Sequence, residues 1–329
     1  MAAPDLPGEF EIIARYFVPL AATEPLAFGL TDDAALIRPT AGCDLVVTTD
    51  GMVSGVHFFP DDPPARVAAK LLRVNLSDLA AMGARPRGYV LVSAWPGDIT
   101  TAWIEDFVAG LAADQARYGI ALLGGDTVRT PGPLSLTVTA FGEVESGRAL
   151  RRNGARPGDA VFVSGSIGDA GLGLSIRRGG LVGLAAGDRD FLLQRHQLPE
   201  PRLELGRELI GIASAAIDVS DGLVADLGHI CDTSGVAAVI DLAQVPLSAA
   251  ARQIVRQQPD LLPGLLGAGD DYELCFTVAP EHAAQLPPIG ERTKVGLTRI
   301  GRIEAGSGVT VIGPDGLPVQ LTETGFHHF

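Results

Sequence analysis

The stretch from Lys70 to Ala84, KLLRVNLSDLAAMGA, constrains the fold of this chain more than any other. Its apolar residues recur at three- and four-residue intervals, which predicts a helix with a buried face. Asn75 and Asp78 share a face with Leu71 and Met82, so this helix carries a carboxylate on a largely apolar surface. Such a group must be protonated, paired or bound to a cation.

Composition narrows the class of protein. A chain of 329 residues that is 47% hydrophobic is long enough for two domains with substantial cores. The formal net charge of −14 argues against a nucleic-acid partner, because nucleic-acid binders present basic surfaces. We find no apolar run of the roughly 18 residues that a membrane span needs and no leader-like N-terminus, which favours a cytoplasmic protein with no membrane partner.

The three cysteines are widely separated and form no CxxC pair, so neither a disulfide framework nor a zinc site is indicated.

Strand-like and helix-like segments alternate along both halves, which predicts an α/β or α+β fold. Short strands are expected at Ala34–Ile37, at Gly296–Ile303 and at Gly308–Ile312, the last two as a pair. The stretch at 148–159, RALRRNGARPGD, is basic, contains Gly and Pro and has no periodicity. We therefore predict a domain boundary there, with an N-terminal domain over 1–147 and a C-terminal domain over 148–329.

Aspartates recur at strand ends and beside glycines: Asp32, Asp33, Asp50, Asp126, Asp218, Asp221, Asp270 and Asp271. Each alone is typical of a turn. Three of them, Asp50, Asp126 and Asp218, follow apolar strand-like runs, where α/β proteins place functional groups. If several converge with Asp78, two carboxylates about 4 Å apart repel by roughly 4 kcal/mol at an effective dielectric constant near 20. Mg²⁺, which prefers oxygen ligands, would relieve that repulsion.

No Walker P-loop and no protein-kinase signature is present. An Mg²⁺ cluster without His or Cys ligands fits phosphoryl transfer, in which catalysis is positioning plus charge neutralisation. The glycine-rich stretch Gly165–Gly173 follows a strand and opens a helix, so it is a weak candidate for a phosphate loop. Three arginines precede this stretch, and they could either contact phosphates or form the solvated face of a linker: Arg148, Arg151 and Arg152. His57 lies between two apolar residues, so it fits either a buried core histidine or a residue of a functional site.

The motifs, taken together and in order, resemble the thiamine-monophosphate kinases of the aminoimidazole-ribonucleotide-synthetase superfamily. They are TTD at 48–50, GVHF at 55–58, VNLSDLAAMGA at 74–84, GGDT at 124–127, IDVSDGL at 217–223 and DYEL at 271–274. They span nearly the whole chain. The resemblance implies an N-terminal domain that dimerises through a β-barrel-like interface and a C-terminal α/β domain.

The resemblance also implies a reaction, in which ATP phosphorylates thiamine monophosphate to thiamine diphosphate by direct in-line transfer assisted by several Mg²⁺ ions. Asp50, Asp78 and Asp126 would be catalytic. The implied metal ligands are Asp33, Thr48, Thr49, Asp50, Asp78, Asp126, Asp218 and Asp221. The implied ATP contacts are Tyr118, Gly125, Asp126, Arg152 and Ser220, and the implied substrate contacts are His57, Asp270 and Phe326.

Three positions depart from the family pattern. Thr31 stands where a glycine usually precedes the aspartate pair, so the turn there is expected to change. Asp270 replaces a glutamate, which shortens the presumed substrate carboxylate by one methylene. Phe326 replaces a Tyr or Trp. These departures affect expected substrate contacts more than expected metal contacts.

Two alternatives stay open at this point. One is another ATP-using enzyme of the same superfamily, such as a ligase of purine synthesis or a selenophosphate-forming enzyme. The other is a non-catalytic protein that binds Mg²⁺ or nucleotide on the same scaffold.

Overall fold

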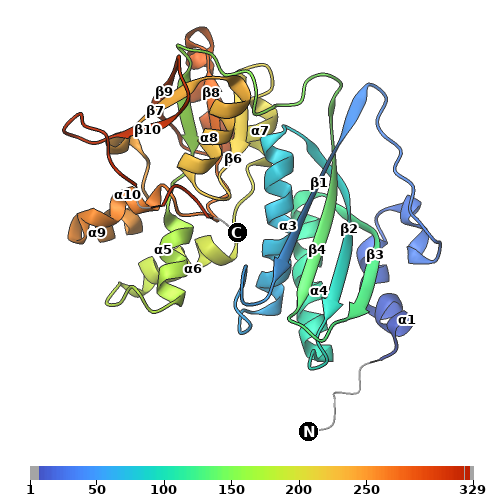
Figure 1. Ribbon diagram of the computed structural model, residues 1–329. Coiled ribbons are helices and arrows are strands. Elements are labelled where there is room, and N and C mark those ends of the chain that lie inside the picture. The colour runs from blue at the N-terminus through green and yellow to red at the C-terminus, as the bar shows by residue number, and fades with distance from the viewer. Residues whose placement is uncertain (1–6, 322, 327–329) are drawn as a thin grey trace. The chain divides into compact units, whose positions relative to one another are not determined.

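The computed structural model describes residues 7–321 and 323–326, and their contacts divide the chain into two units (Figure 1). Unit 1 consists of the chain up to Leu79 together with Arg85–Gly147. Unit 2 consists of Ala80–Ala84 together with the chain from Arg148 onward. The predicted α/β or α+β class is confirmed, because each unit combines one sheet with several helices.

The helix predicted at 70–84 is α3, which spans Pro64–Ala81 and so begins earlier than the apolar pattern suggested. Gly83 follows it with a φ of +70°, a left-handed conformation that suits glycine, and its N–H bonds to the Ala80 carbonyl at 3.0 Å. The residues on its buried side include Asn75, which is fully buried.

Unit 1 is a four-stranded sheet in the order β1-β4-β2-β3 with α3 and α4 along one face (Figure 1). Its elements are α1 (Glu9–Ile12), η1 (Ile13–Phe17), α2 (Val18–Ala21), η2 (Pro25–Leu30), β1 (Cys43–Val53), β2 (Arg85–Trp95), α4 (Thr101–Tyr118), β3 (Ala121–Arg129) and β4 (Ser135–Glu145). Only β2 and β3 run parallel. The strand predicted at Ala34–Ile37 is wrong, since that segment has no regular structure.

One contact joins α3 to α4, and a second joins α4 to the sheet. Arg73 of α3 donates two hydrogen bonds to Asp114 of α4, at 2.7 and 2.8 Å, and both side chains are buried. Tyr89 of β2 is fully buried and its hydroxyl accepts a hydrogen bond from Gln115 of α4 at 3.1 Å. These contacts identify the helix-covered face of the sheet, so the opposite face of the four strands is its open face.

Unit 2 has a six-stranded sheet in the order β10-β7-β9-β5-β8-β6. Its strands are β5 (Ala160–Ser164), β6 (Ala213–Asp218), β7 (Ala237–Asp241), β8 (Leu274–Val278), β9 (Leu297–Glu304) and β10 (Gly308–Ile312). The predicted pairing of the last two strands is wrong. The strand β10 pairs parallel with β7, and β9 lies between β7 and β5.

Both faces of this sheet are covered. Its helical elements are α5 (Asp169–Arg177), α6 (Ala186–Gln197), α7 (Leu203–Glu208), α8 (Leu223–Ser234), η3 (Leu242–Gln244), α9 (Ala249–Gln257), η4 (Pro259–Leu261), α10 (Leu262–Leu265), η5 (Pro280–Gln285) and α11 (Leu286–Thr293). Leu227 and Ile230 of α8 pack with Cys275 in one cluster, and Leu205 of α7 packs with Phe276 in another. Successive residues of β8 thus face opposite layers, as the twofold periodicity of a strand requires.

Candidate active site

Four polar residues meet where β1 lies against α3, and we call Thr48, Asp50, Asn75 and Asp78 the β1–α3 group. The Thr48 hydroxyl donates a hydrogen bond to the Asp78 carboxylate. The Asp50 N–H donates to the Asn75 side-chain oxygen at 3.1 Å. The Asn75 amide in turn donates to the Leu71 carbonyl at 2.9 Å, one turn back along the helix. The sequence motifs TTD and NLSD therefore lie side by side although they are far apart in the chain.

The donor chemistry of the β1–α3 group fits Mg²⁺. It offers carboxylate and hydroxyl oxygens, which are the ligands that hard divalent cations prefer. It contains neither imidazole nor thiolate, the ligands of softer metals. Asp50 and Asp78 are only partly exposed, so a cation at this position would offset the cost of holding two carboxylates away from bulk water. The side chain of Thr49, between Thr48 and Asp50 on β1, points to the open face of the sheet. There the Thr139 hydroxyl donates to the Thr49 hydroxyl at 3.0 Å.

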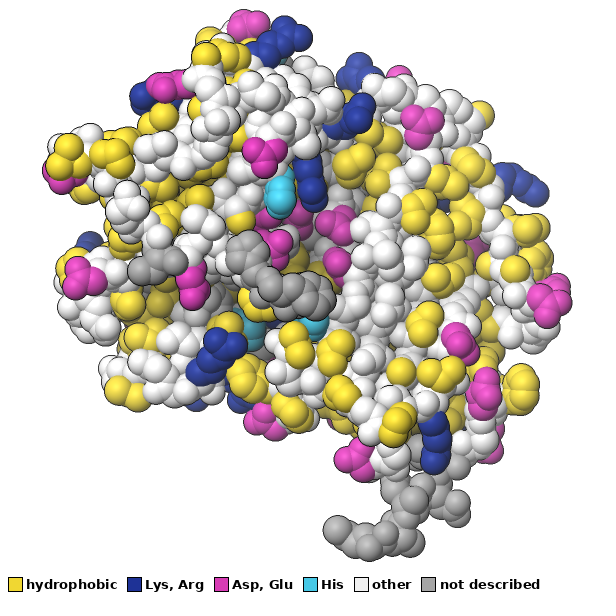
Figure 2. All heavy atoms as spheres, viewed as in Figure 1, with side chains coloured by type: hydrophobic (Ala, Val, Ile, Leu, Met, Phe, Trp, Pro, Cys, Tyr) yellow, Lys and Arg dark blue, Asp and Glu magenta, His cyan; other side chains and the backbone are white. Residues whose placement is uncertain are grey.

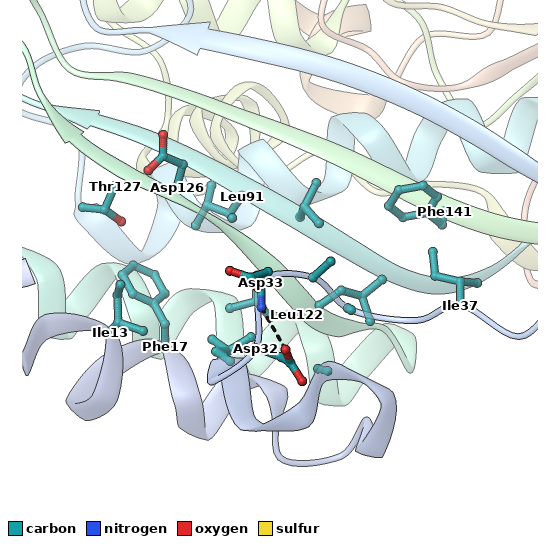
Figure 3. A pocket seen from close by; sticks show the side chains of 18 of the residues that line it. Ile13, Phe17, Asp32, Asp33, Ile37, Leu91, Leu122, Asp126, Thr127 and Phe141 are labelled. Carbon is teal, nitrogen blue, oxygen red and sulfur yellow. Dashed lines mark hydrogen bonds between the residues drawn. The ribbon is translucent and has the colours of Figure 1, made fainter. Parts of the chain in front are cut away.

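A second acidic group surrounds a pocket of about 440 Å³ beside β3 (Figure 3). Asp32 and Asp33 approach it from the loop after η2, and Asp126 and Gly125 approach it from β3. Apolar side chains complete the wall, and they include Ile13, Phe17, Leu91, Leu122 and Phe141. The pocket thus brings together Asp33, Gly125 and Asp126, three residues that the family resemblance assigns to ATP and metal.

Two details of this pocket follow from local geometry. A Cβ on Gly125 would overlap the Leu91 carbonyl oxygen, so only glycine fits between the two strands. Thr31, which replaces the usual glycine, has a φ of −108°. Positive φ values fall instead on Phe28, Gly29 and Leu30. The expected change of the turn at Thr31 therefore brings no backbone strain at that residue.

The two acidic groups of unit 1 lie at opposite edges of the sheet, since β1 and β3 are its edge strands. Three strand spacings of about 4.8 Å separate β1 from β3, or about 14 Å. They also lie on opposite faces. Asp50 is in the row of Val138 and Leu91, which are buried on the helix-covered side, whereas Asp126 is beside Val92, which is 42% exposed. Asp50 and Asp78 are thus brought together through the contacts of β1 with α3, and Asp126 is not brought to them.

Within 7–321 and 323–326, no group of three or more His, Cys, Asp or Glu side chains is placed to hold a metal ion.

In unit 2, the end of β6 and the loop after it gather five of the residues predicted for the site. Ser220 and Asp221 lie in this loop, and Asp218 ends the strand before it. The Ser220 carbonyl accepts the Asp270 N–H at 2.8 Å, and the Asp221 carbonyl accepts the Phe326 N–H at 2.9 Å. Backbone hydrogen bonds thus attach two other segments, which carry Asp270 and Phe326, to this one loop.

Asp226 holds that loop in shape, and sequence reasoning missed it. One carboxylate oxygen of Asp226 accepts the N–H groups of Ser220, Asp221 and Gly222 at 3.0 to 3.1 Å. Burial raises the pKa of Asp226 to about 7, against the stabilising effect of the backbone N–H groups. An aspartate in the first turn of a helix that follows Asp-Gly is the signal that could have identified it.

The glycine-rich stretch Gly165–Gly173 is not built as a phosphate loop. The N–H groups of Gly168 and Ala170, at the start of α5, donate to the buried carboxylate of Asp271 at 2.6 and 3.2 Å. A phosphate at a helix N-terminus would need these same donors. The protein's own carboxylate occupies them, and burial raises its pKa to about 8.

The remaining predicted residues have other surroundings. The Val53 N–H donates to Nδ1 of His57 at 3.0 Å in the turn after β1. The Tyr118 ring ends α4, with the guanidinium carbons of Arg73 and Arg117 at 5.6 and 5.0 Å from its centre. Arg152 is exposed in the segment of unit 2 before β5, and its carbonyl accepts from the Ser234 hydroxyl at 3.3 Å.

The sequence matches two family models in tandem. They are AIR synthase related protein, N-terminal domain, over residues 31–144, and AIR synthase related protein, C-terminal domain, over residues 156–314. The chain belongs to the AIR synthase related family, and within it to the thiamine-monophosphate kinases, because close relatives of that name match almost its whole length.

One such relative, the thiamine-monophosphate kinase of Caulobacter vibrioides, is 44% identical over 97% of this chain and 91% of its own. The crystal structure of the thiamine-monophosphate kinase of Stenotrophomonas maltophilia has a TM-score of 0.84 at 44% identity and covers 95% of this chain and 98% of that one. A structure of AaThiL complexed with AMPPCP and TMP has a TM-score of 0.78 at 31% identity and covers 98% and 97%.

In the part of the chain that the structure describes, every helix is too short or too polar to cross a membrane.

Proposed function

We propose that this chain transfers the γ-phosphoryl group of ATP to thiamine monophosphate, giving thiamine diphosphate and ADP. The observation that carries the proposal is the β1–α3 group, in which hydrogen bonds hold the oxygen ligands of the two acidic motifs together. The complex of a relative with AMPPCP and TMP supports the choice of substrates.

The proposed roles follow the chemistry of each group. Asp50 and Asp78, with Thr48, would bind Mg²⁺, which would neutralise charge on the phosphates of ATP. The proposed further metal ligands are Asp33, Thr49, Asp126, Asp218 and Asp221. The proposed ATP contacts are Tyr118, Gly125, Asp126, Arg152 and Ser220, and the proposed contacts to thiamine monophosphate are His57, Asp270 and Phe326.

We propose that the active form is a homodimer in which each acidic site is shared by two copies. The open face of the sheet exposes Leu45, Val47, Val92 and Val128, an apolar surface that a second copy would cover. Figure 2 shows hydrophobic side chains over this sheet, with polar and acidic side chains among them.

A twofold axis would set the β1 edge of each copy against the β3 edge of the other, which gives two equivalent shared sites. Asp126 and Asp33 of one copy would then complete the β1–α3 group of its partner.

The function is tested by incubating the protein with γ-labelled ATP, Mg²⁺ and thiamine monophosphate and separating the products by chromatography. We expect labelled thiamine diphosphate and an equal amount of ADP. Thiamine in place of its monophosphate is the acceptor control. ATP hydrolysis with no labelled thiamine diphosphate would favour another ATP-using activity of the family, and binding without turnover would favour a non-catalytic protein.

Removing the Phe326 ring is expected to weaken the binding of thiamine monophosphate. The Phe326 N–H bonds to the loop through the backbone, and its ring is 49% exposed, so a substrate ring could stack on its open side. For Phe326→Ala we expect KM for thiamine monophosphate to rise about tenfold and KM for ATP to stay within about twofold, which corresponds to a stacking free energy of about 1.4 kcal/mol.

Phe326→Tyr keeps the ring and serves as the conservative control, and Phe10→Ala removes another exposed ring. Equal increases in both KM values for Phe326→Ala would exclude the stacking role.

A further inference from the structure

His196 of α6 is a buried histidine that has no role in the proposed reaction as described above. It is only 3% exposed. Its Nδ1 lies 3.3 Å from Oδ2 of Asp270, and among the described residues this nitrogen makes no hydrogen bond. A buried imidazole nitrogen without a full hydrogen bond is costly, so its approach to a carboxylate calls for an explanation.

The carboxylate it faces is held in an unusual backbone position. Asp270 has a φ of +69°, a left-handed conformation that is costly for a residue other than glycine. The hydrogen bond from its N–H to the Ser220 carbonyl keeps it there. On the other side, the Tyr272 hydroxyl donates to Oδ1 of Asp270 at 3.3 Å. His196 and Tyr272 therefore approach the two oxygens of one carboxylate, which is itself 30% exposed.

Glycines of α5 set the distance between His196 and Asp270. A Cβ on Gly173 would overlap the Leu192 carbonyl oxygen and lie 2.9 Å from Cβ of His196, so α6 packs directly on the backbone of α5. A Cβ on Gly171 would overlap Cβ of Ala268, two residues before Asp270. The helix α5 thus serves as a thin spacer that brings both partners to the same place.

We infer that His196 is a positioning residue for substrate binding: it fixes the Asp270 carboxylate for the part of thiamine monophosphate that carries N–H donors or positive charge. A carboxylate repels a phosphate group and attracts the thiazolium and aminopyrimidine portions of the substrate. Asp270 is one methylene shorter than glutamate, so its reach depends on a firm anchor. This inference rests on the proposed function.

The test compares two substitutions of His196. His196→Leu removes the nitrogen and keeps the side-chain volume similar. His196→Asn restores a donor, because its Nδ2 occupies the same position along the side chain as Nδ1. His229→Leu, at an exposed position of α8, is the matched control. Thiamine monophosphate is titrated into each protein by calorimetry without ATP, and KM for both substrates and the melting temperature are measured on the same samples.

We expect His196→Leu to raise the Kd and the KM for thiamine monophosphate about tenfold while KM for ATP stays within about twofold, since the Asp270 carboxylate loses the polar contact that fixes it. His196→Asn should recover most of this loss. Equal changes in both KM values, or no recovery in a folded Asn variant, would overturn the positioning role.

If the wild-type protein binds thiamine monophosphate but forms no thiamine diphosphate, the proposed function fails and the calorimetric comparison still decides the role of His196. If the wild-type protein does not bind it at all, both proposals fall.

Discussion

Replacing Asp78 with asparagine is expected to lower kcat about a thousandfold at saturating Mg²⁺, while the protein stays folded. The loss corresponds to about 4 kcal/mol of transition-state stabilisation. The physical reason is charge. Asparagine keeps an oxygen that can accept the hydrogen bond from the Thr48 hydroxyl but removes the negative charge that a cation needs.

The measurement for Asp78→Asn is the steady-state rate over a range of Mg²⁺ concentrations, with the melting temperature of the same sample. Asp106→Asn, which removes a charge from an exposed position of α4, is the matched control and should leave the rate unchanged. A near-normal rate for Asp78→Asn at saturating Mg²⁺ would remove the β1–α3 group from the reaction.

Asp126→Asn is expected to cost a similar factor, about a hundredfold to a thousandfold in kcat, although Asp126 lies on the other face and the other edge of the sheet from Asp50. Asp126 is exposed in the structure, so the substitution should leave the melting temperature nearly unchanged. A merely exposed aspartate would give no loss of rate. Asp98→Asn, in the loop between β2 and α4, is such an exposed aspartate and is the control.

The sequence is sufficient to predict the helix that carries Asn75 and Asp78, because helix formation depends on short-range patterns. The periodicity of 70–84 predicts the helix α3 and marks Asp78 as a carboxylate that needs a partner. Its contact with Thr48 agrees with that reasoning. The phosphate-loop interpretation of Gly165–Gly173 is wrong because the group that accepts from its N–H donors, the Asp271 carboxyl, is distant in sequence.

The arrangement of the acids could not be predicted from the sequence. Whether Asp50 and Asp126 share a face depends on strand order and on register, which shifts between Tyr89 and Val90. A shift of one residue moves every following side chain to the other face. The contact of His196 with Asp270 was beyond sequence reasoning for a similar reason, since glycines of a third segment set the distance.

The shared acidic site is tested most directly by combining the two inactive variants in one dimer. Asp78→Asn and Asp126→Asn copies, each with a different affinity tag, are co-expressed, and the mixed species is isolated with both tags. In the mixed dimer, one site receives both substitutions and the other receives neither, so we expect about half of the wild-type kcat per dimer. Activity as low as that of each variant alone, or a protein that remains monomeric, would contradict a site built from two copies.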